Sequence, residues 1–483
     1  MSLSSYLSYS LAASGVFIAL LYVYYTIFFF IDCYKLRKFR GPLALPIIGN
    51  CYSMDSLKFM SFLSKLRKIY GKSYTFFGLN RSFLVLCDPQ AVRRILSDNK
   101  TFIKGTDYTK IFAVAFGLGL ITSNGEKHKH DRSVFAKYFI RSSVVKHMEI
   151  INTLTAEMIN DGKSLYTGKE IDIEHFFAIL SLRLFTYIYV GLDYRGKPQR
   201  ECEIADIVSK GSAAVGDMVT FSMPTSNLNP YVRKIKHAKN FFWNEIKDNI
   251  KERRAAIASG TETSDDCLTA MINDNMNDEE MLDHLTTLIC AGHDTTAFFC
   301  SYIIYLLANH QDEQDTLREE INRVMGDRTV VTENDVTDMK YLSKVMQETL
   351  RLYSIVPCLT RYSTEEIHIK ECGITIPKNV TVLFPMFLIN RDPELWENPS
   401  QFNPERFDSK AEAFTSAKNG FFPFGYGTRT CIGNTLSILE SGVIITQLLR
   451  KYKVKPSPGF KLQILAGISM VTSNGVKVVL SPV

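Results

Sequence analysis

The stretch FPFGYGTRTCIGNTLSILE, residues 422–440, decides how the rest of the chain is interpreted. Gly425, Gly427 and Gly433 surround Cys431, and a helix-like periodic stretch follows directly. Glycine permits tight turns and lets a backbone approach a flat ligand closely. Unpaired amides at a helix N-terminus also stabilise a thiolate. This loop is therefore a candidate for presenting a cysteine sulfur to a metal.

Cys431 has two other interpretations, a buried structural cysteine and a zinc ligand. A buried structural cysteine in a glycine-rich turn is the commoner fate of this residue type. A zinc site is disfavoured because no second cysteine or histidine lies within ligand spacing of Cys431. The ten cysteines start at Cys33 and contain no CxxC pair, which predicts reduced thiols in a cytosol-facing protein.

The string from Phe424 to Gly433 resembles the haem-binding signature of the cytochrome P-450 family in its phenylalanine, glycine, arginine and cysteine spacing. The resemblance implies that Cys431 is the axial thiolate ligand of a haem iron. It also implies that Arg429 pairs with a haem propionate, and that Phe424 and Gly425 belong to the cofactor-binding loop.

A second motif, AGHDTT at residues 291–296, lies in the middle of the clearest predicted helix, 278–309. A mid-helix glycine costs about 1 kcal/mol relative to alanine, and a threonine that bonds back one turn can bend the helix and open space for a small ligand. An exposed polar patch is the alternative, although the flanking residues are apolar. The resemblance implies that Asp294 and Thr295 are the catalytic acid–alcohol pair that relays protons during oxygen activation.

A third motif pairs Glu348 with Arg351, and Arg406 follows about 55 residues later. An i,i+3 ion pair on a helix surface is common and contributes only a few tenths of a kcal/mol. The resemblance implies a Glu–Arg–Arg set that locks the scaffold of the haem loop. We therefore expect these three residues to be structural.

Three further residues are predicted to bind the cofactor because of the resemblance. Arg361 occupies the place of a second propionate-binding arginine, and Arg132 matches the arginine of a Trp-x-x-x-Arg haem contact. His128 stands where that motif has its tryptophan. An imidazole can still donate to a propionate, and the alternative is a solvent-facing histidine.

The N-terminal region predicts a membrane anchor. Residues 11–31 form an apolar run of 21 residues, and about 20 helical residues span a bilayer core. A cleaved signal peptide fits less well, because the run is long and no small-residue cleavage site follows it. A basic cluster comes next, which by the positive-inside rule stays in the cytoplasm: Lys35, Arg37, Lys38 and Arg40.

Pattern and composition predict the rest of the architecture. Most of the chain has helical periodicity, with a strand hairpin near residues 73–87 and short strands in 366–382. The expected fold class is mainly α with small β-sheets (α+β), and the resemblance implies the P-450 fold. The expected domains are an anchor at 1–34, a basic and proline-rich spacer at 35–49, and one large catalytic domain at 50–483. The net charge of +6 is small and dispersed, so no nucleic-acid partner is expected.

The resemblance implies a membrane-anchored haem-thiolate monooxygenase that inserts one oxygen atom from O2 into a small lipophilic substrate, a sterol, a fatty acid or another lipid or xenobiotic. The implied cofactor is haem b, and electrons come from NADPH through a flavoprotein reductase, the NADPH–cytochrome P-450 reductase, with cytochrome b5 as a further candidate donor. The implied location is the endoplasmic reticulum membrane, single-pass, with a cytosolic catalytic domain. Lys127, Lys129 and Lys137 form either a basic docking face or a merely solvated helix face.

Family analogy also predicts the pocket, whose apolar lining suits a lipophilic guest and ordinary core packing equally. The predicted lining residues are Phe102, Tyr108, Phe112, Phe116, Leu288, Ala291, Ile355 to Leu359 and Ile468 to Val471. The segment Phe221–Tyr231 is a candidate lid. Two rival functions are a haem-thiolate isomerase or dehydratase acting without a reductase, and a non-catalytic haem or lipid carrier.

Overall fold

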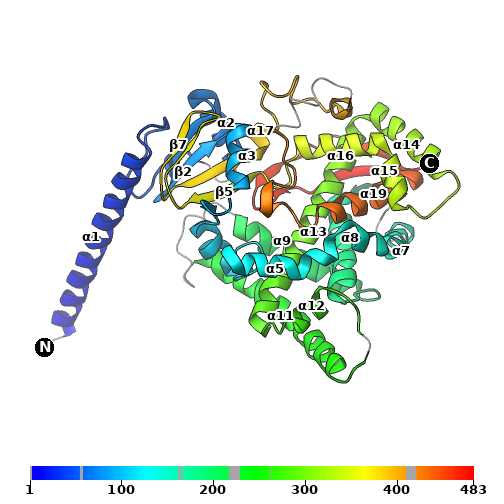
Figure 1. The fold of residues 1–483 in the computed structure, drawn as a ribbon, viewed down its shortest axis with the longest axis horizontal. Coiled ribbons are helices and arrows are strands. Elements are labelled where there is room, and N and C mark those ends of the chain that lie inside the picture. Colours follow the sequence, from blue (N-terminus) through cyan, green and yellow to red (C-terminus); the bar gives the residue numbers. More distant parts are fainter. Residues whose placement is uncertain are drawn as a thin grey trace. The chain divides into compact units, whose positions relative to one another are not determined.

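The computed structural model divides the chain into two compact units, shown with the rest of the ribbon in Figure 1. The first comprises Met1–Ile103 and Leu359–Pro385, and the second comprises Lys104–Cys358 and Met386–Val483. The domain boundaries expected from the sequence stay a prediction. The structure describes residues 3–54, 58–161, 165, 167–216, 229–261, 263–409 and 420–483.

The first unit is built on a five-stranded sheet in the order β1-β2-β8-β5-β3. Its strands are β1 (Ser73–Gly78), β2 (Arg81–Leu86), β3 (Phe102–Ile103), β5 (Cys358–Ser363) and β8 (Thr381–Pro385). The β1–β2 pair is antiparallel and stacks Phe76 on Phe83, which confirms the predicted hairpin. Helix α2 (Phe59–Tyr70) packs its phenylalanines against Phe76, and α3 (Pro89–Ser97) follows β2. A small ribbon pairs β6 (Ile367–Ile369) with β7 (Ile374–Ile376).

Helix α1 (Leu3–Lys35) exposes large apolar side chains between residues 16 and 31. The stretch Ser14–Lys35, 22 residues, is long and apolar enough to cross a membrane. The C-terminal end of α1 joins the sheet, because Phe29 packs on Phe77 and the Ser82 hydroxyl donates to Asp32 at 2.7 Å. An outward-facing apolar helix of this kind is consistent with membrane anchoring.

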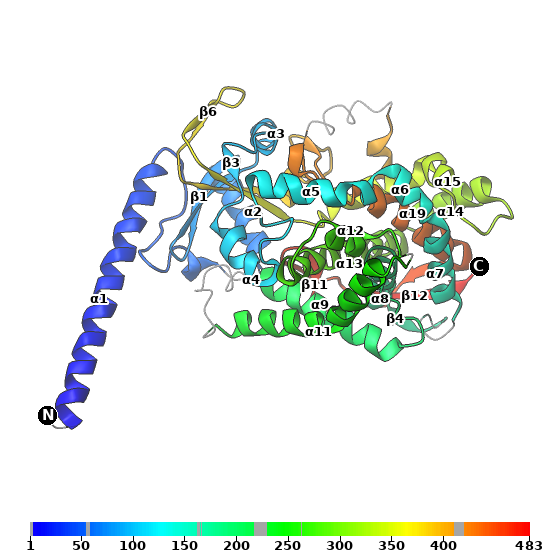
Figure 2. The same cartoon turned by 60° about the horizontal axis from the view of Figure 1, so that its bottom comes forward.

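The second unit is helical and centres on α13 (Asp278–Asn309), which is buried along most of its length (Figures 1 and 2). A capping box between Asn277 and Glu280 fixes its start, as the sequence predicts. The helices α8 (Ile173–Phe185), α16 (Lys340–Leu352) and α19 (Asn434–Lys451) pack on it. The predicted helix after Cys431 is therefore confirmed.

The remaining elements of the second unit confirm the mainly α class with small sheets. The helices are α4 (Ala113–Phe116), α5 (Gly125–Phe139), α6 (Arg141–Lys146), α7 (Met148–Asn160), α9 (Pro198–Gly216), α11 (Pro230–Ala258), α12 (Cys267–Asn273), α14 (Gln311–Met325), α15 (Glu333–Asp338) and α17 (Met386–Ile389). The strands are β4 (Glu170–Asp172), β9 (Tyr452–Pro456), β10 (Ile464–Ala466), β11 (Met470–Thr472) and β12 (Lys477–Pro482). They form a three-stranded sheet, β4-β12-β9, and the pair β10-β11.

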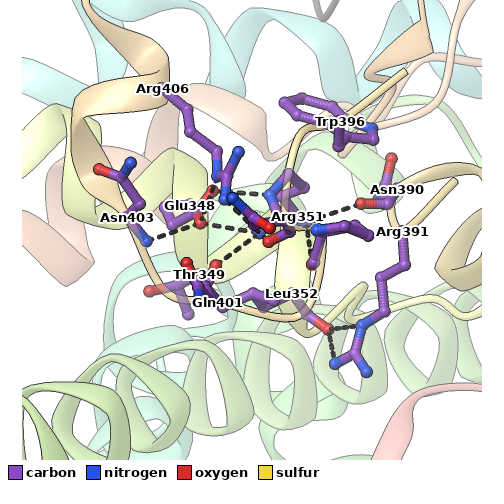
Figure 3. Close-up of polar contacts among 12 residues, drawn as sticks. Glu348, Thr349, Arg351, Leu352, Asn390, Arg391, Trp396, Gln401, Asn403 and Arg406 are labelled. Atoms are coloured by element: carbon purple, nitrogen blue, oxygen red, sulfur yellow. Dashed lines mark hydrogen bonds and ion pairs between the residues drawn. The ribbon is translucent and has the colours of Figure 1, made fainter. Parts of the chain in front are cut away.

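A buried cluster joins α16 to the segment before the Cys431 loop (Figure 3). Arg351 donates through Nε and Nη2 to the two oxygens of Glu348, both at 2.7 Å, and Arg406 Nε lies 3.3 Å from Glu348. The other N–H groups of Arg351 donate to the carbonyls of Asn390, Pro399 and Gln401. All five guanidinium N–H groups are thus used. The sequence-predicted Glu–Arg–Arg set is assembled in the structure as a closed, fully buried cluster.

Candidate functional site

The Cys431 loop folds back on itself before α19 begins. The N–H of Cys431 donates to the carbonyl of Phe424 at 2.8 Å, and the N–H of Gly425 donates to Phe422 at 3.0 Å. Gly425 and Gly427 have φ values of +75° and +74°, which only a residue without a Cβ adopts readily. The glycines flanking the cysteine are therefore required by the turn itself.

The side chain of Cys431 is exposed although it lies deep among other protein atoms. Burial raises the pKa of its thiol, whereas a hydrogen bond from the Gly433 N–H and the charge of Arg132 act in the opposite direction. Cys431 is therefore exposed to solvent although many protein atoms surround it.

The middle of α13 also has an accessible face. Ala291 is exposed and Thr295 is partly exposed, although both lie in a helix that is otherwise largely buried. The Thr295 hydroxyl donates to the Ala291 carbonyl at 2.6 Å, as the sequence predicts. Gly292 has a packing role, because a Cβ there would overlap the ring of Phe185 on α8. The mid-helix glycine is therefore explained by the close approach of α8 and α13.

Asp294 is buried beside this accessible face. Its carboxylate accepts a hydrogen bond from Ser209 on α9 at 3.0 Å, and Nδ1 of His293 lies 2.8 Å from the same oxygen. The alternative of an exposed polar patch is therefore wrong for Asp294. Sequence reasoning missed Ser209, because nothing in the pattern of α9 connects it with a residue 85 positions later.

Two predicted arginines lie at the Cys431 loop. Arg132, on α5, donates to the Thr430 carbonyl at 2.8 Å. Arg429 donates to the carbonyl of Ser123 at 2.7 Å and to the side chain of Asn124 at 3.2 Å. These hydrogen bonds hold the two guanidiniums beside the Cys431 loop. Asn124 was not predicted. Its side-chain oxygen also accepts from the N–H of Lys104, and its NH2 group donates to the Lys104 carbonyl.

The other predicted cofactor residues lie on α5, in the Cys431 loop and on β5. His128 is on α5 and 6% exposed, so the solvent-facing alternative is wrong. Phe424 is half-buried against the core. Arg361 is buried on β5 of the first unit and donates to the Thr360 carbonyl. Its role towards a cofactor stays a prediction.

The lysines considered as a docking face are only partly available. Lys127 lies 3.4 Å from acidic oxygens of both Asp131 and Glu280. Lys137 lies over the ring of Tyr138, whereas Lys129 is 79% exposed. This distribution favours the solvated helix face over a concentrated basic surface.

A small apolar cavity lies among α4, α9, α11 and α13, with a volume of about 30 Å³. Of the predicted lining residues, Phe116 borders it, while Tyr108 and Phe112 pack with Phe116 in one apolar cluster. The contributions of α9 and α11 were missed, because their apolar residues had no local signal beyond ordinary amphipathicity. Most of the candidate lid, residues 221–228, falls outside the described residues.

Comparisons with known proteins place the chain in a family. A family model described as Cytochrome P450 matches residues 39–477. Cytochrome P450 4d2 of Drosophila melanogaster is 26% identical over 92% of this chain and 93% of its own length. A cytokinin hydroxylase of Arabidopsis thaliana is 27% identical (86% and 82%), and cytochrome P450 3A13 of Mus musculus is 26% identical (88% and 86%).

The chain belongs to the cytochrome P450 family. It is a monooxygenase of that family, whose members carry haem and receive electrons from a redox partner. The residues of the second unit fit a haem: the exposed Cys431 suits the iron, half-buried Phe424 and Ile432 offer apolar walls, and two guanidiniums suit the propionates.

Proposed function

We propose that this enzyme inserts one oxygen atom from O2 into a small lipophilic substrate, with haem b as its cofactor. Electrons would come from NADPH through a flavoprotein reductase, with cytochrome b5 as a further candidate donor. The observation that carries the proposal is the exposed Cys431, held on a glycine loop ahead of α19. A structural cysteine would not need to remain accessible there.

Cys431 would ligate the haem iron, and the bound haem would supply the activation of O2. Arg132 and Arg429 would pair with the propionates, because their hydrogen bonds hold both guanidiniums at the Cys431 loop. His128 would donate to the same region, and Phe424 and Gly425 would border the ring.

Asp294 and Thr295 would carry the proton needed for the reaction. Thr295 is accessible, and its hydroxyl is oriented by the bond to Ala291, so it would hold a proton at Oγ1 on the accessible face of α13. Asp294 would resupply that proton, with its carboxylate positioned by Ser209. A buried acid beside an accessible alcohol can move protons without opening the site to bulk water.

The apolar α1 would anchor the protein as a single span in the endoplasmic reticulum membrane, with the catalytic domain in the cytosol. Its exposed apolar surface and the basic residues that follow support this topology. A membrane location would also bring the enzyme close to lipophilic substrates.

The test is the absorption spectrum of the reduced, CO-bound protein. The wild type should give the strongly red-shifted Soret band of thiolate ligation, and Cys431→Ser should abolish it. Cys202→Ser is the matched control, because Cys202 is a half-buried cysteine on α9 and should leave the band intact. A normal band in Cys431→Ser would refute the ligand assignment.

A second measurement tests the reaction. The enzyme reconstituted with reductase and NADPH should consume O2 with a lipophilic substrate, and Thr295→Ala should uncouple that consumption from product formation. Peroxide turnover without NADPH that Thr295→Ala leaves unchanged would instead establish the isomerase or dehydratase reaction.

A further inference from the structure

His293 is a buried histidine directly beside the proposed catalytic acid. Its side chain is 0% exposed, and its Nδ1 lies 2.8 Å from Oδ1 of Asp294. Neither ring nitrogen of His293 has an aligned hydrogen-bond partner among the residues that the structure describes. A buried polar group without such a partner costs about 1–3 kcal/mol. The structure therefore holds an unsatisfied imidazole in contact with the carboxylate of Asp294.

The packing of neighbouring helices fixes both members of this pair. Ser181, on α8, donates through its hydroxyl to the His293 carbonyl at 3.0 Å. One residue earlier, Gly292 has no room for a Cβ against α8. Ser209, on α9, donates to the same Asp294 oxygen that His293 approaches. The backbone of His293 and the carboxylate of Asp294 are thus both held in place by helices other than α13.

A further acid acts on the pair from α8. Glu174 is partly exposed, and its carboxylate accepts a hydrogen bond from the Thr472 hydroxyl at 2.7 Å. Burial raises the pKa of Glu174 to about 7, although the bond from Thr472 opposes this rise. The charges of Asp172 and Asp294 add to the rise, and that of Lys477 opposes it. Glu174 is therefore within electrostatic reach of Asp294, and negative neighbours favour the positively charged form of an imidazole.

Two proton arrangements of the pair have the same net charge. In one, an imidazolium faces a carboxylate, and in the other, a neutral imidazole faces a carboxylic acid. They differ only in whether one proton is on Nδ1 of His293 or on Oδ1 of Asp294, while Nε2 keeps its hydrogen in both. Burial favours the neutral acid, whereas an adjacent imidazolium favours the carboxylate. These opposing effects allow the proton to move between the two atoms without changing the net charge of a buried site.

We propose that His293 is a positioning residue that shares one proton with Asp294 and keeps that proton transferable. The inference rests on the proposed monooxygenase function, in which Asp294 resupplies the proton of Thr295. When the Thr295 hydroxyl gives up a proton in the reaction, Asp294 replaces it at Oγ1, and a proton from solvent restores the pair. Without the imidazole, burial holds the proton on Asp294, and its transfer to Thr295 slows.

The first test is the infrared spectrum of the purified holoenzyme, which reports carboxyl protonation without turnover. Asp294→Asn identifies the band of the protonated Asp294 carboxyl by removing it. We expect this band to be about twofold stronger in His293→Leu, because an evenly shared proton becomes one that Asp294 holds alone. Ser181→Ala is the control, since it alters the contact to the His293 carbonyl and not the ring, and it should leave the band unchanged.

Turnover separates proton sharing from a simple hydrogen bond. With reductase and NADPH, His293→Leu should form about fivefold less product per O2 consumed, a smaller loss than the roughly 100-fold or more expected when a general acid itself is removed. His293→Asn can place an amide N–H where Nδ1 stands, but it cannot become charged. It should therefore not restore the product yield, whereas Ser181→Ala should keep the yield of the wild type.

Two results would overturn the proposal. One is full product yield in His293→Asn, which would mean that a neutral hydrogen bond is sufficient. The other is an unchanged carboxyl band in His293→Leu, as expected of a histidine that only fills space. Each variant is first shown to keep the CO-bound Soret band of thiolate ligation, so failure of this inference is distinct from failure of the proposed function.

Discussion

Two groups of arginines in the second unit differ in what they bind. Arg351 and Arg406 surround Glu348, all three are buried, and their N–H groups donate to its carboxylate and to backbone carbonyls (Figure 3). Arg132 and Arg429 instead donate to neutral oxygens beside an exposed sulfur. The first group is closed and complete within the fold. The second, open group lies at the loop that carries the proposed haem ligand.

Breaking the closed group should have the largest effect. Glu348→Ala would leave Arg351 as a buried charge without its carboxylate, and removal of one partner of a buried pair costs about 3–5 kcal/mol. Urea unfolding of the purified enzyme measures this loss. Lys344→Ala on the same helix is the control, since Lys344 pairs with exposed acids and should cost less than about 1 kcal/mol. Equal losses for both variants would contradict the comparison.

Glu440 is a buried acid that, among the described residues, has no arginine partner, so it can be compared directly with Glu348. Burial raises the pKa of Glu440 on α19 to about 8, and its Oε1 has no hydrogen-bond partner within the described residues. The unfolded chain loses this proton near pH 4.5, while the folded protein keeps it up to about pH 8. The contribution of Glu440 to the free energy of unfolding is therefore fully present below pH 4.5, and it is lost as the pH rises from 4.5 towards 8.

Glu440→Gln removes this titration. We expect the variant to gain about 2 kcal/mol relative to the wild type between pH 6 and pH 8. The measurement is the urea midpoint at pH 6, 7 and 8. A wild type and variant with parallel pH profiles would show that Glu440 is ionised in the folded protein.

The open group should affect cofactor retention more than folding. Arg132→Gln is expected to speed haem loss about tenfold, because a hydrogen bond to a charged group contributes about 1.5–3 kcal/mol. Transfer of haem to an acceptor protein measures the rate. Lys129→Gln lies on the same helix, is exposed, and should leave that rate unchanged. Loss of folding stability without faster haem loss in Arg132→Gln would make Arg132 a structural residue like Arg351.

The smallest effect is expected where α13 packs against α8. Gly292→Ala would gain up to about 1 kcal/mol in helix propensity, but its Cβ would overlap Phe185, and overpacking costs about 1–3 kcal/mol. We expect a net loss of about 1 kcal/mol in thermal or urea unfolding. Gly211→Ala on α9 is the control, since its nearest neighbour would be 3.4 Å away. A stabilised Gly292→Ala would mean that α8 moves aside.

The site residues were predictable to the extent that their signal is local. The spacing of glycines around Cys431 predicted the loop, and the Thr295 side chain bonds the carbonyl one turn earlier, as its place in a helix allows. The role of Gly292 was not predictable, because its reason is a phenylalanine on another helix. The sequence left Lys127 open between a docking face and a solvated helix face, because its neighbour Glu280 is 153 residues away along the chain.

The sequence by itself determined the long helix from Asp278 to Asn309, the β1–β2 hairpin and the turn that carries Cys431, because caps, periodicity and glycine φ values act over a few residues. Only the tertiary structure decided which groups meet. The bond from Ser209 to Asp294 joins different helices, and the lack of an aligned hydrogen-bond partner for the His293 ring within the described residues is visible only once its surroundings are packed. Such contacts depend on how helices pack, and local sequence pattern does not encode that packing.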